Sequence, residues 1–285
     1  MKSRIQVFSC ISVLSLAVLI SCGKKEEKVD NTLTQTEAAS NNAFAEQQYN
    51  DVTTLVDQSA RNGAALFGAA GTGSGSGISS LLSGCATLTL DTTSTPRSIT
   101  IDFGSSNCLC LDGRNRRGKI IATYTGRYTD AGTTINISLD NYYVNDNKIA
   151  GTKQIINQGF NNSGNLVYKI IVDGQIVKAN NMGTVNWAST RYREWTAGYN
   201  TPLNILDDVY SITGDANGTT HNGKPYTITA TAPLVRKMNC RWFESGILVL
   251  SMTGLPDITL DYGETGCDAN ATVTILGQAF PVILQ

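Results

Sequence analysis

The fold of this chain is decided by the stretch Thr134-Ile135-Asn136-Ile137-Ser138-Leu139. Ile135, Ile137 and Leu139 alternate with polar residues, which is the pattern of a β-strand that buries one face. Comparable Thr-rich and β-branched runs, separated by Gly, Asn and Asp turns, continue through residues 85–285. Because these runs follow one another through short turns, we predict a mainly β fold: a large antiparallel meander or sandwich-like domain, preceded by one short amphipathic helix.

The expected elements can be placed by residue number. Strands are predicted at 86–91, 97–103, 118–128, 133–144, 148–158, 165–173, 175–179, 184–195, 209–214, 225–232, 246–253, 257–262, 270–276 and 279–284. Hairpin turns are predicted at 161–164, at Gly174 and at Asn222-Gly223. The segment 40–67 has helical spacing of its apolar residues, with a stop at Asn62-Gly63. We expect a polar tether at 22–39 and a Gly-rich linker at 68–84.

The N-terminal residues indicate export from the cytoplasm. Lys2 and Arg4 precede an apolar run, residues 5–20, that is shorter than the roughly 20 residues needed to span a bilayer. It ends in Leu19-Ile20-Ser21-Cys22, which resembles a bacterial lipobox. The resemblance implies a signal peptide at 1–21 and acyl chains on Cys22, so the partner of this end is a membrane. The alternative interpretation is a buried or retained helix.

The residues after Cys22 resemble a sorting signal. Lys25-Glu26-Glu27 is similar to the lysine-plus-acidic signal with which Bacteroidota export lipoproteins to the outer face of the outer membrane. The resemblance implies a lipid-anchored protein on the cell-surface side. The alternative is a charge cluster that is merely solvated.

Charge and composition exclude several classes of function. Without Lys2 and Arg4, 20 basic residues (22 − 2) stand against 23 acidic ones, which leaves no excess of basic charge for nucleic acid. His221 is the one histidine, so most zinc sites and most His-dependent catalysis are excluded. We predict no catalytic residues, no metal and no cofactor, and we do not expect an enzyme.

A repeated unit suggests a disulfide pattern. Ile99-Thr100-Ile101-Asp102-Phe103-Gly104 precedes Cys108, and Ile258-Thr259-Leu260-Asp261-Tyr262-Gly263 precedes Cys267. The spacing from glycine to cysteine is the same in both copies. Cys85 lies upstream of the first copy and Cys240 upstream of the second. We therefore predict Cys85–Cys108 and Cys240–Cys267, with Cys85–Cys110 as the competing pair for the first unit.

Two groups of residues are candidates for ligand binding. Arg114, Arg116 and Arg117 form a dense cationic cluster that could bind phosphate, sulfate or lipopolysaccharide head groups, unless they lie on a solvated turn. Arg191, Arg193 and Trp195 lie two apart on one strand face and could bind an anionic glycan, unless they form a charge ladder with a buried Trp. A third hypothesis is a carbohydrate platform of aromatic residues, which could equally be core. Its members are Trp187, Trp242, Tyr142, Tyr143, Tyr199 and Tyr210.

Taken together, the lipobox, the sorting signal and the Cys-bounded β region resemble an uncharacterised group of Bacteroidota lipoproteins. Other segments that carry the resemblance are 85–91, 112–114, 141–147, 191–195 and 260–263. The resemblance implies a location and a β-rich fold but no activity. We expect a non-enzymatic binding, adhesion or envelope-structural role, with a glycan or envelope polymer as partner. The alternatives are a periplasmic carrier of an apolar ligand and a carboxylate-based glycan hydrolase.

Overall fold

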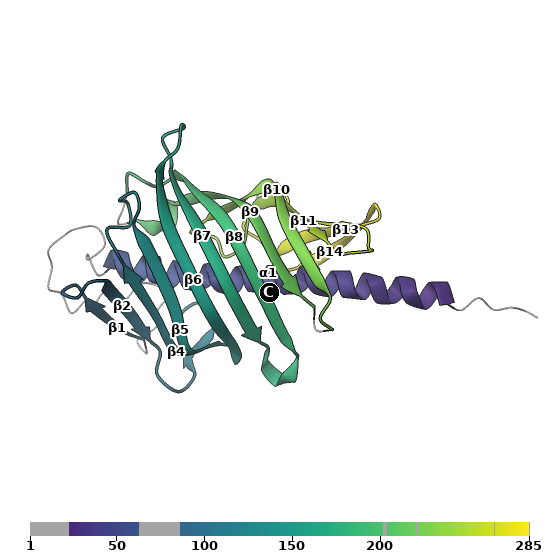
Figure 1. Ribbon diagram of the computed structural model, residues 1–285, viewed down its shortest axis with the longest axis horizontal. Helices are drawn as coiled ribbons and strands as arrows, with labels where there is room; N and C mark the ends of the chain where they lie inside the picture. Colours follow the sequence, from purple (N-terminus) through teal and green to yellow (C-terminus); the bar gives the residue numbers. More distant parts are fainter. Residues whose placement is uncertain (1–22, 63–85, 202–203, 221, 265, 285) are drawn as a thin grey trace, which may run out of the picture.

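A computed structural model describes residues 23–62, 86–201, 204–220, 222–264 and 266–284. The fold is mainly β, with one sheet of fourteen strands and one long helix, α1, at Gly23–Asn62 (Figure 1). The strands are β1 Thr87–Asp91, β2 Arg97–Asp102, β3 Cys108–Leu109, β4 Asn115–Tyr124, β5 Thr134–Val144, β6 Asn147–Phe160, β7 Leu166–Val177, β8 Thr184–Ala197, β9 Val209–Thr219, β10 Pro225–Lys237, β11 Ser245–Ser251, β12 Ile258–Asp261, β13 Asn270–Ile275 and β14 Gln278–Ile283.

The sheet is an antiparallel meander. Strands that follow one another in the sequence are neighbours throughout, except that the short β3 pairs only with β4 beside the main path. The predicted meander is therefore confirmed. Alternating side chains of the central strands are buried; Ile135 and Ile137 of β5 are both 2 % exposed.

The sheet curls around helix α1, which crosses one of its faces (Figure 1). Near one end of the sheet, the Gln35 amide donates to the carbonyl of Pro256 at 2.5 Å. In the middle, the Tyr49 hydroxyl donates to the carbonyl of Ala150 at 2.7 Å. Asp51 pairs with Arg114 from the N-terminal part of the sheet. Contacts on several sides explain why both polar and apolar residues of the helix are buried.

Helix α1 is longer than predicted and includes most of the segment that was predicted as a tether. Residues 23–39 belong to the same continuous helix as 40–62, so the expected tether at 22–39 is wrong from Gly23 onward. The segment lacks proline and is rich in good helix formers, and its Ala38 and Ala39 pack against the sheet. Its polar character suggested a solvated tether because the polar partners in the sheet are not apparent from the local sequence. The signal peptide and the Gly-rich linker at 68–84 lie outside the described residues.

Gly174 lies in the middle of β7 and not in a turn, so the two strands predicted at 165–173 and 175–179 are one strand. Its partner in β8 is Trp187. A Cβ at position 174 would lie 2.1 Å from the Tyr49 hydroxyl oxygen. The glycine therefore makes room for the helix, rather than for a turn.

The two similar segments have the same local geometry. Asp102 accepts a hydrogen bond from the Gly104 N–H at 2.8 Å, and Asp261 accepts one from the Gly263 N–H at 2.8 Å. Cys240 and Cys267 form the predicted disulfide.

The first cysteine unit is described only in part. Cys108 is also disulfide-bonded, whereas Cys110 is a buried free thiol. Cys85, the predicted partner of Cys108, lies outside the described residues.

Candidate functional site

The arginines of β8 face the helix. Arg191 pairs with Glu46, with 2.6 Å between Nη2 and Oε2, and the two side chains are only 4 % and 3 % exposed. Arg193 lies 3.5 Å from the carboxylate of Asp57. Arg191, Arg193 and Trp195 do share one strand face, as predicted, but all three side chains are buried. An external glycan therefore cannot reach them. The two arginines pair with carboxylates of α1, and Trp195 packs against Tyr128, Tyr199 and Tyr210.

The proposed aromatic platform is largely core. Trp187 stacks on Tyr49 with ring centroids 5.6 Å apart, and its indole N–H donates to Asn42 at 2.8 Å. Tyr142 and Tyr210 are also buried. These residues cannot form an exposed carbohydrate surface, because they pack between the sheet and the helix.

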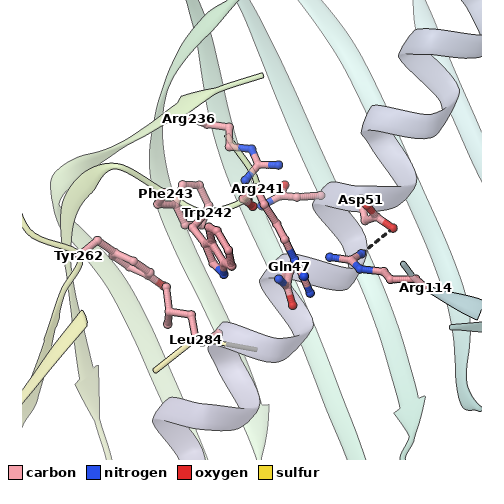
Figure 2. A pocket seen from close by; sticks show the side chains of 11 residues that line it. Gln47, Asp51, Arg114, Arg236, Arg241, Trp242, Phe243, Tyr262 and Leu284 are labelled. Atoms are coloured by element: carbon pink, nitrogen blue, oxygen red, sulfur yellow. Dashed lines mark hydrogen bonds and ion pairs between the residues drawn. The ribbon is translucent and has the colours of Figure 1, made fainter. Parts of the chain in front are cut away.

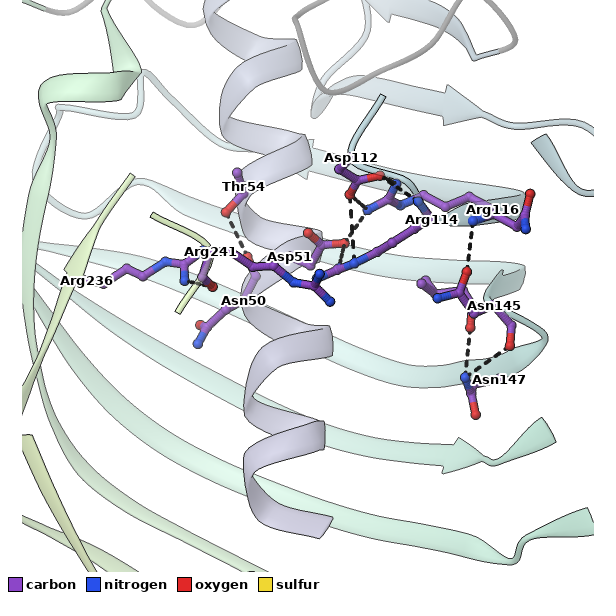
Figure 3. A network of polar contacts seen from close by, with 12 residues as sticks. Asn50, Asp51, Thr54, Asp112, Arg114, Arg116, Asn145, Asn147, Arg236 and Arg241 are labelled. Carbon is purple, nitrogen blue, oxygen red and sulfur yellow. Dashed lines mark hydrogen bonds and ion pairs between the residues drawn. The ribbon is translucent and has the colours of Figure 1, made fainter. Parts of the chain in front are cut away.

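The arginines of the cationic cluster at 114–117 have different partners, and Figure 3 shows Arg114 and Arg116 directed toward Asp51 and Asp112. The side chain of Arg116 is 0 % exposed and binds both Asp112 and Asp51, at 2.6 and 2.7 Å. Arg114 also binds Asp51, at 2.9 Å. Arg117 points outward and pairs with Asp146. The alternative prediction, a solvated turn, is wrong for Arg114 and Arg116. Both arginines are buried, and they pair with Asp51 of the helix and with Asp112.

A pocket lies where Arg114 approaches the C-terminal part of the sheet across α1 (Figure 2). Arg236 comes from β10, Arg241 and Trp242 from the connection to β11, and Tyr262 from the residue after β12. We call this site the arginine pocket. Gln47, Asn50 and Asp51 of the helix form one wall, and Ala43, Phe243 and Leu284 complete the lining. Its cavity volume is about 50 Å³, which suits a small group.

Three hydrogen-bond donors in the arginine pocket have no acceptor among the described residues. They are Nε2 of Gln47, Nε1 of Trp242 and the hydroxyl of Tyr262, and all three atoms are buried. Tyr262 as a whole is 5 % exposed, and burial raises the pKa of its phenol, so its hydroxyl remains protonated. Buried polar groups in native proteins are normally hydrogen-bonded, so unpartnered donors indicate that an acceptor belongs there.

Positive charge dominates the arginine pocket and its surroundings. Arg114, Arg116, Arg236 and Arg241 carry four positive charges, whereas Asp51 and Asp112 carry two negative ones, which leaves a net charge of +2 (4 − 2). Burial lowers the pKa of Arg236 to about 10. Asp51 opposes this shift, whereas the positive charges of Arg114 and Arg241 add to it. A bound anion would offset both the burial and the mutual repulsion of these cations.

Comparisons with protein-family models, curated protein sequences and solved structures found no match for this chain. Among the described residues, no helix combines the length and the hydrophobicity that crossing a membrane requires.

Most residues of the arginine pocket were not apparent from the sequence. Arg114 belonged to the predicted anion-binding cluster, and Trp242 to the proposed aromatic platform. Arg236, Arg241 and Gln47 were not singled out, because each stands in an ordinary local context. They come together only when the sheet curls around the helix, and no spacing in the sequence reports that curvature.

Proposed function

We propose that this chain is a non-enzymatic binding protein whose arginine pocket takes an oxyanion of the phosphate class. The observation that carries the proposal is the combination of a net positive charge with three buried donors that find no acceptor in the described part of the chain. Arginine recognises phosphate through paired, charge-assisted hydrogen bonds, and indole and phenol groups donate to the same oxygens. A neutral sugar would leave the repulsion between the guanidinium groups uncompensated.

The lining of the arginine pocket supports binding over hydrolysis. Among the described residues that line it, Asp51 is the one carboxylate, and it is already paired with Arg114 and Arg116. A glycosidase needs two carboxylates placed on either side of the scissile bond. This pocket holds a surplus of donors instead.

Isothermal titration calorimetry with inorganic phosphate tests the proposal. Arg241 is exposed and has no salt-bridge partner among the described residues, so R241A should fold normally. Arg97 of β2 is an exposed arginine away from the pocket, so R97A is the matched control. We expect R241A to weaken phosphate binding at least 10-fold, with R97A unchanged. Absence of phosphate binding, or equal binding by R241A, would contradict the proposal.

We also propose that acyl chains on Cys22 anchor the protein in the outer membrane. The helix begins at Gly23, and its N-terminal end extends beyond the strands (Figure 1). Thr34 is the first buried side chain described, so roughly 17 Å of helix would separate the anchor from the sheet. C22S should release the protein from the membrane fraction; retention of C22S there would contradict anchoring.

Exposure on the cell surface is a separate proposal, based on Lys25-Glu26-Glu27. Replacement of these three residues by alanine should protect the protein from protease added to intact cells. The lipid-anchored protein should remain in the membrane fraction, which distinguishes sorting from anchoring. Unchanged protease sensitivity would contradict export to the outer face.

A further inference from the structure

We propose that the ligand is a phosphorylated amphiphile with a single acyl or alkyl chain, its phosphate in the arginine pocket and its chain in an adjoining groove. The inference rests on the proposed function and names the class of ligand. Its basis is the contact between two different environments on helix α1. One is rich in donors and positive charge, and the other is apolar.

The apolar groove lies between α1 and the last strands of the sheet. Its cavity volume is about 270 Å³, close to the lower end of the ~300–1,000 Å³ range of small-molecule sites. Phe44 of the helix, Leu260 of β12, Val273 of β13 and Ile283 of β14 contribute apolar side chains. None of the described residues that line the groove is charged. Its surface therefore suits a hydrocarbon chain.

The groove and the arginine pocket are contiguous. Ala43 and Leu284 line both cavities, so a ligand that extends past these two residues would occupy both. In Figure 2, Leu284 lies beside the helix below Tyr262 and Trp242. A ligand with a polar group at one end and a chain at the other matches this arrangement.

The charge of the arginine pocket favours a phosphate monoester as the head group. A phosphate monoester carries a net charge of about −1.5 to −2 at about pH 7, which would balance the net charge of +2 around the pocket. Its three terminal oxygens can accept from arginine, the Trp242 indole and the Tyr262 hydroxyl together. The charge and the donors of the arginine pocket therefore favour a phosphate monoester as the head group of the molecule whose chain lies in the groove.

The groove is open at its outer side. Ile283 lines it and is 70 % exposed, although it is apolar. Phe280 of the same strand is also exposed but does not line the groove. These two residues therefore provide a matched pair of variants in which folding should not be affected.

Calorimetric titrations with inorganic phosphate, dodecyl phosphate and dodecyl maltoside, all below micelle concentrations, test the inference. Burial of about four methylene groups is enough to tighten binding about 100-fold, so dodecyl phosphate should bind at least 100-fold more tightly than phosphate. I283D should weaken the binding of dodecyl phosphate at least 10-fold and leave the binding of inorganic phosphate unchanged. F280D should change the affinity for neither ligand, and R241A should weaken the binding of both.

The outcomes separate the two proposals. If phosphate binds in an Arg241-dependent manner but dodecyl phosphate binds no more tightly, the anion site stands and the amphiphile is refuted. If dodecyl maltoside binds as tightly as dodecyl phosphate, the head group is not recognised and the inference fails. If I283D and F280D have equal effects, the chain does not lie in this groove, and the inference fails as well.

Discussion

Gly174 of β7 lies directly against Tyr49 of α1, so closely that a Cβ at position 174 would be 2.1 Å from the Tyr49 hydroxyl oxygen. The Tyr49 ring is held there by stacking on Trp187 and by its hydrogen bond to Ala150. The glycine thus fixes how near the helix can come to the sheet.

Replacement of Gly174 by alanine should destabilise the protein. Overpacking of a well-filled interior costs about 1–3 kcal/mol in the free energy of unfolding, because neighbouring groups must move. Urea unfolding followed by tryptophan fluorescence measures the change. In a Y49A background the added methyl group has room, so G174A should cost less there by at least about 1 kcal/mol. Equal costs in both backgrounds would show that Tyr49 is not the obstacle.

For the buried pair of Glu46 and Arg191, removal of one partner should destabilise the protein more than removal of both. E46A leaves the Arg191 guanidinium buried without its carboxylate and should cost about 3–5 kcal/mol of unfolding free energy. The double variant E46M/R191M removes both charges and should cost less than E46A alone. Chemical denaturation of the three proteins measures this. K237A is the control, because Lys237 and Glu244 form a more exposed pair worth about 1 kcal/mol or less.

Lys153 of β6 should make stability depend on pH. It is buried, and its ammonium group donates to the carbonyl of Tyr49 at 2.7 Å. Burial lowers its pKa to about 7, and the charge of Arg193 acts in the same direction, whereas Glu46 and Asp57 oppose the shift. Between about pH 7 and the ordinary lysine value near 10.4, the unfolded chain binds more protons than the folded one. The contribution of Lys153 to stability therefore rises with pH across this window.

Urea unfolding at pH 7 and pH 9 tests the contribution of Lys153. K153M should reduce the gain in unfolding free energy between the two pH values. K169M, which removes a half-buried lysine of the neighbouring strand, should leave that gain unchanged. An identical gain in K153M and the original protein would contradict this account of Lys153.

The strands were predictable because alternation of residues such as Ile135 and Ile137 is a local signal. The packing of helix α1 against the sheet could not be predicted in this way. Arg191 and Arg193 were correctly placed on one face of a strand, but no local pattern shows that the face is covered by α1. Gly174 was interpreted as a turn because its partner, Tyr49, lies far away in the sequence.

The site was less predictable than the fold for the same physical reason. Arg114 belonged to a visible charge cluster, whereas Arg241 and Tyr262 are single residues in separate segments. What makes them a site is the missing acceptor for buried donors, and burial is a property of the folded chain. Sequence patterns report local periodicity and do not report which distant groups share a cavity.

Binding of an oxyanion in the arginine pocket can be followed through the indole N–H signals of the three tryptophans in a ¹H–¹⁵N spectrum. Trp242 lines the pocket and its Nε1 has no acceptor among the residues that the structure describes, whereas Trp187 already donates to Asn42. W242F assigns the relevant signal. We predict that inorganic phosphate moves the Trp242 indole signal downfield in a saturable way, that the Trp187 signal stays in place, and that R241A weakens the response. A Trp242 signal that does not move at high phosphate would contradict the account.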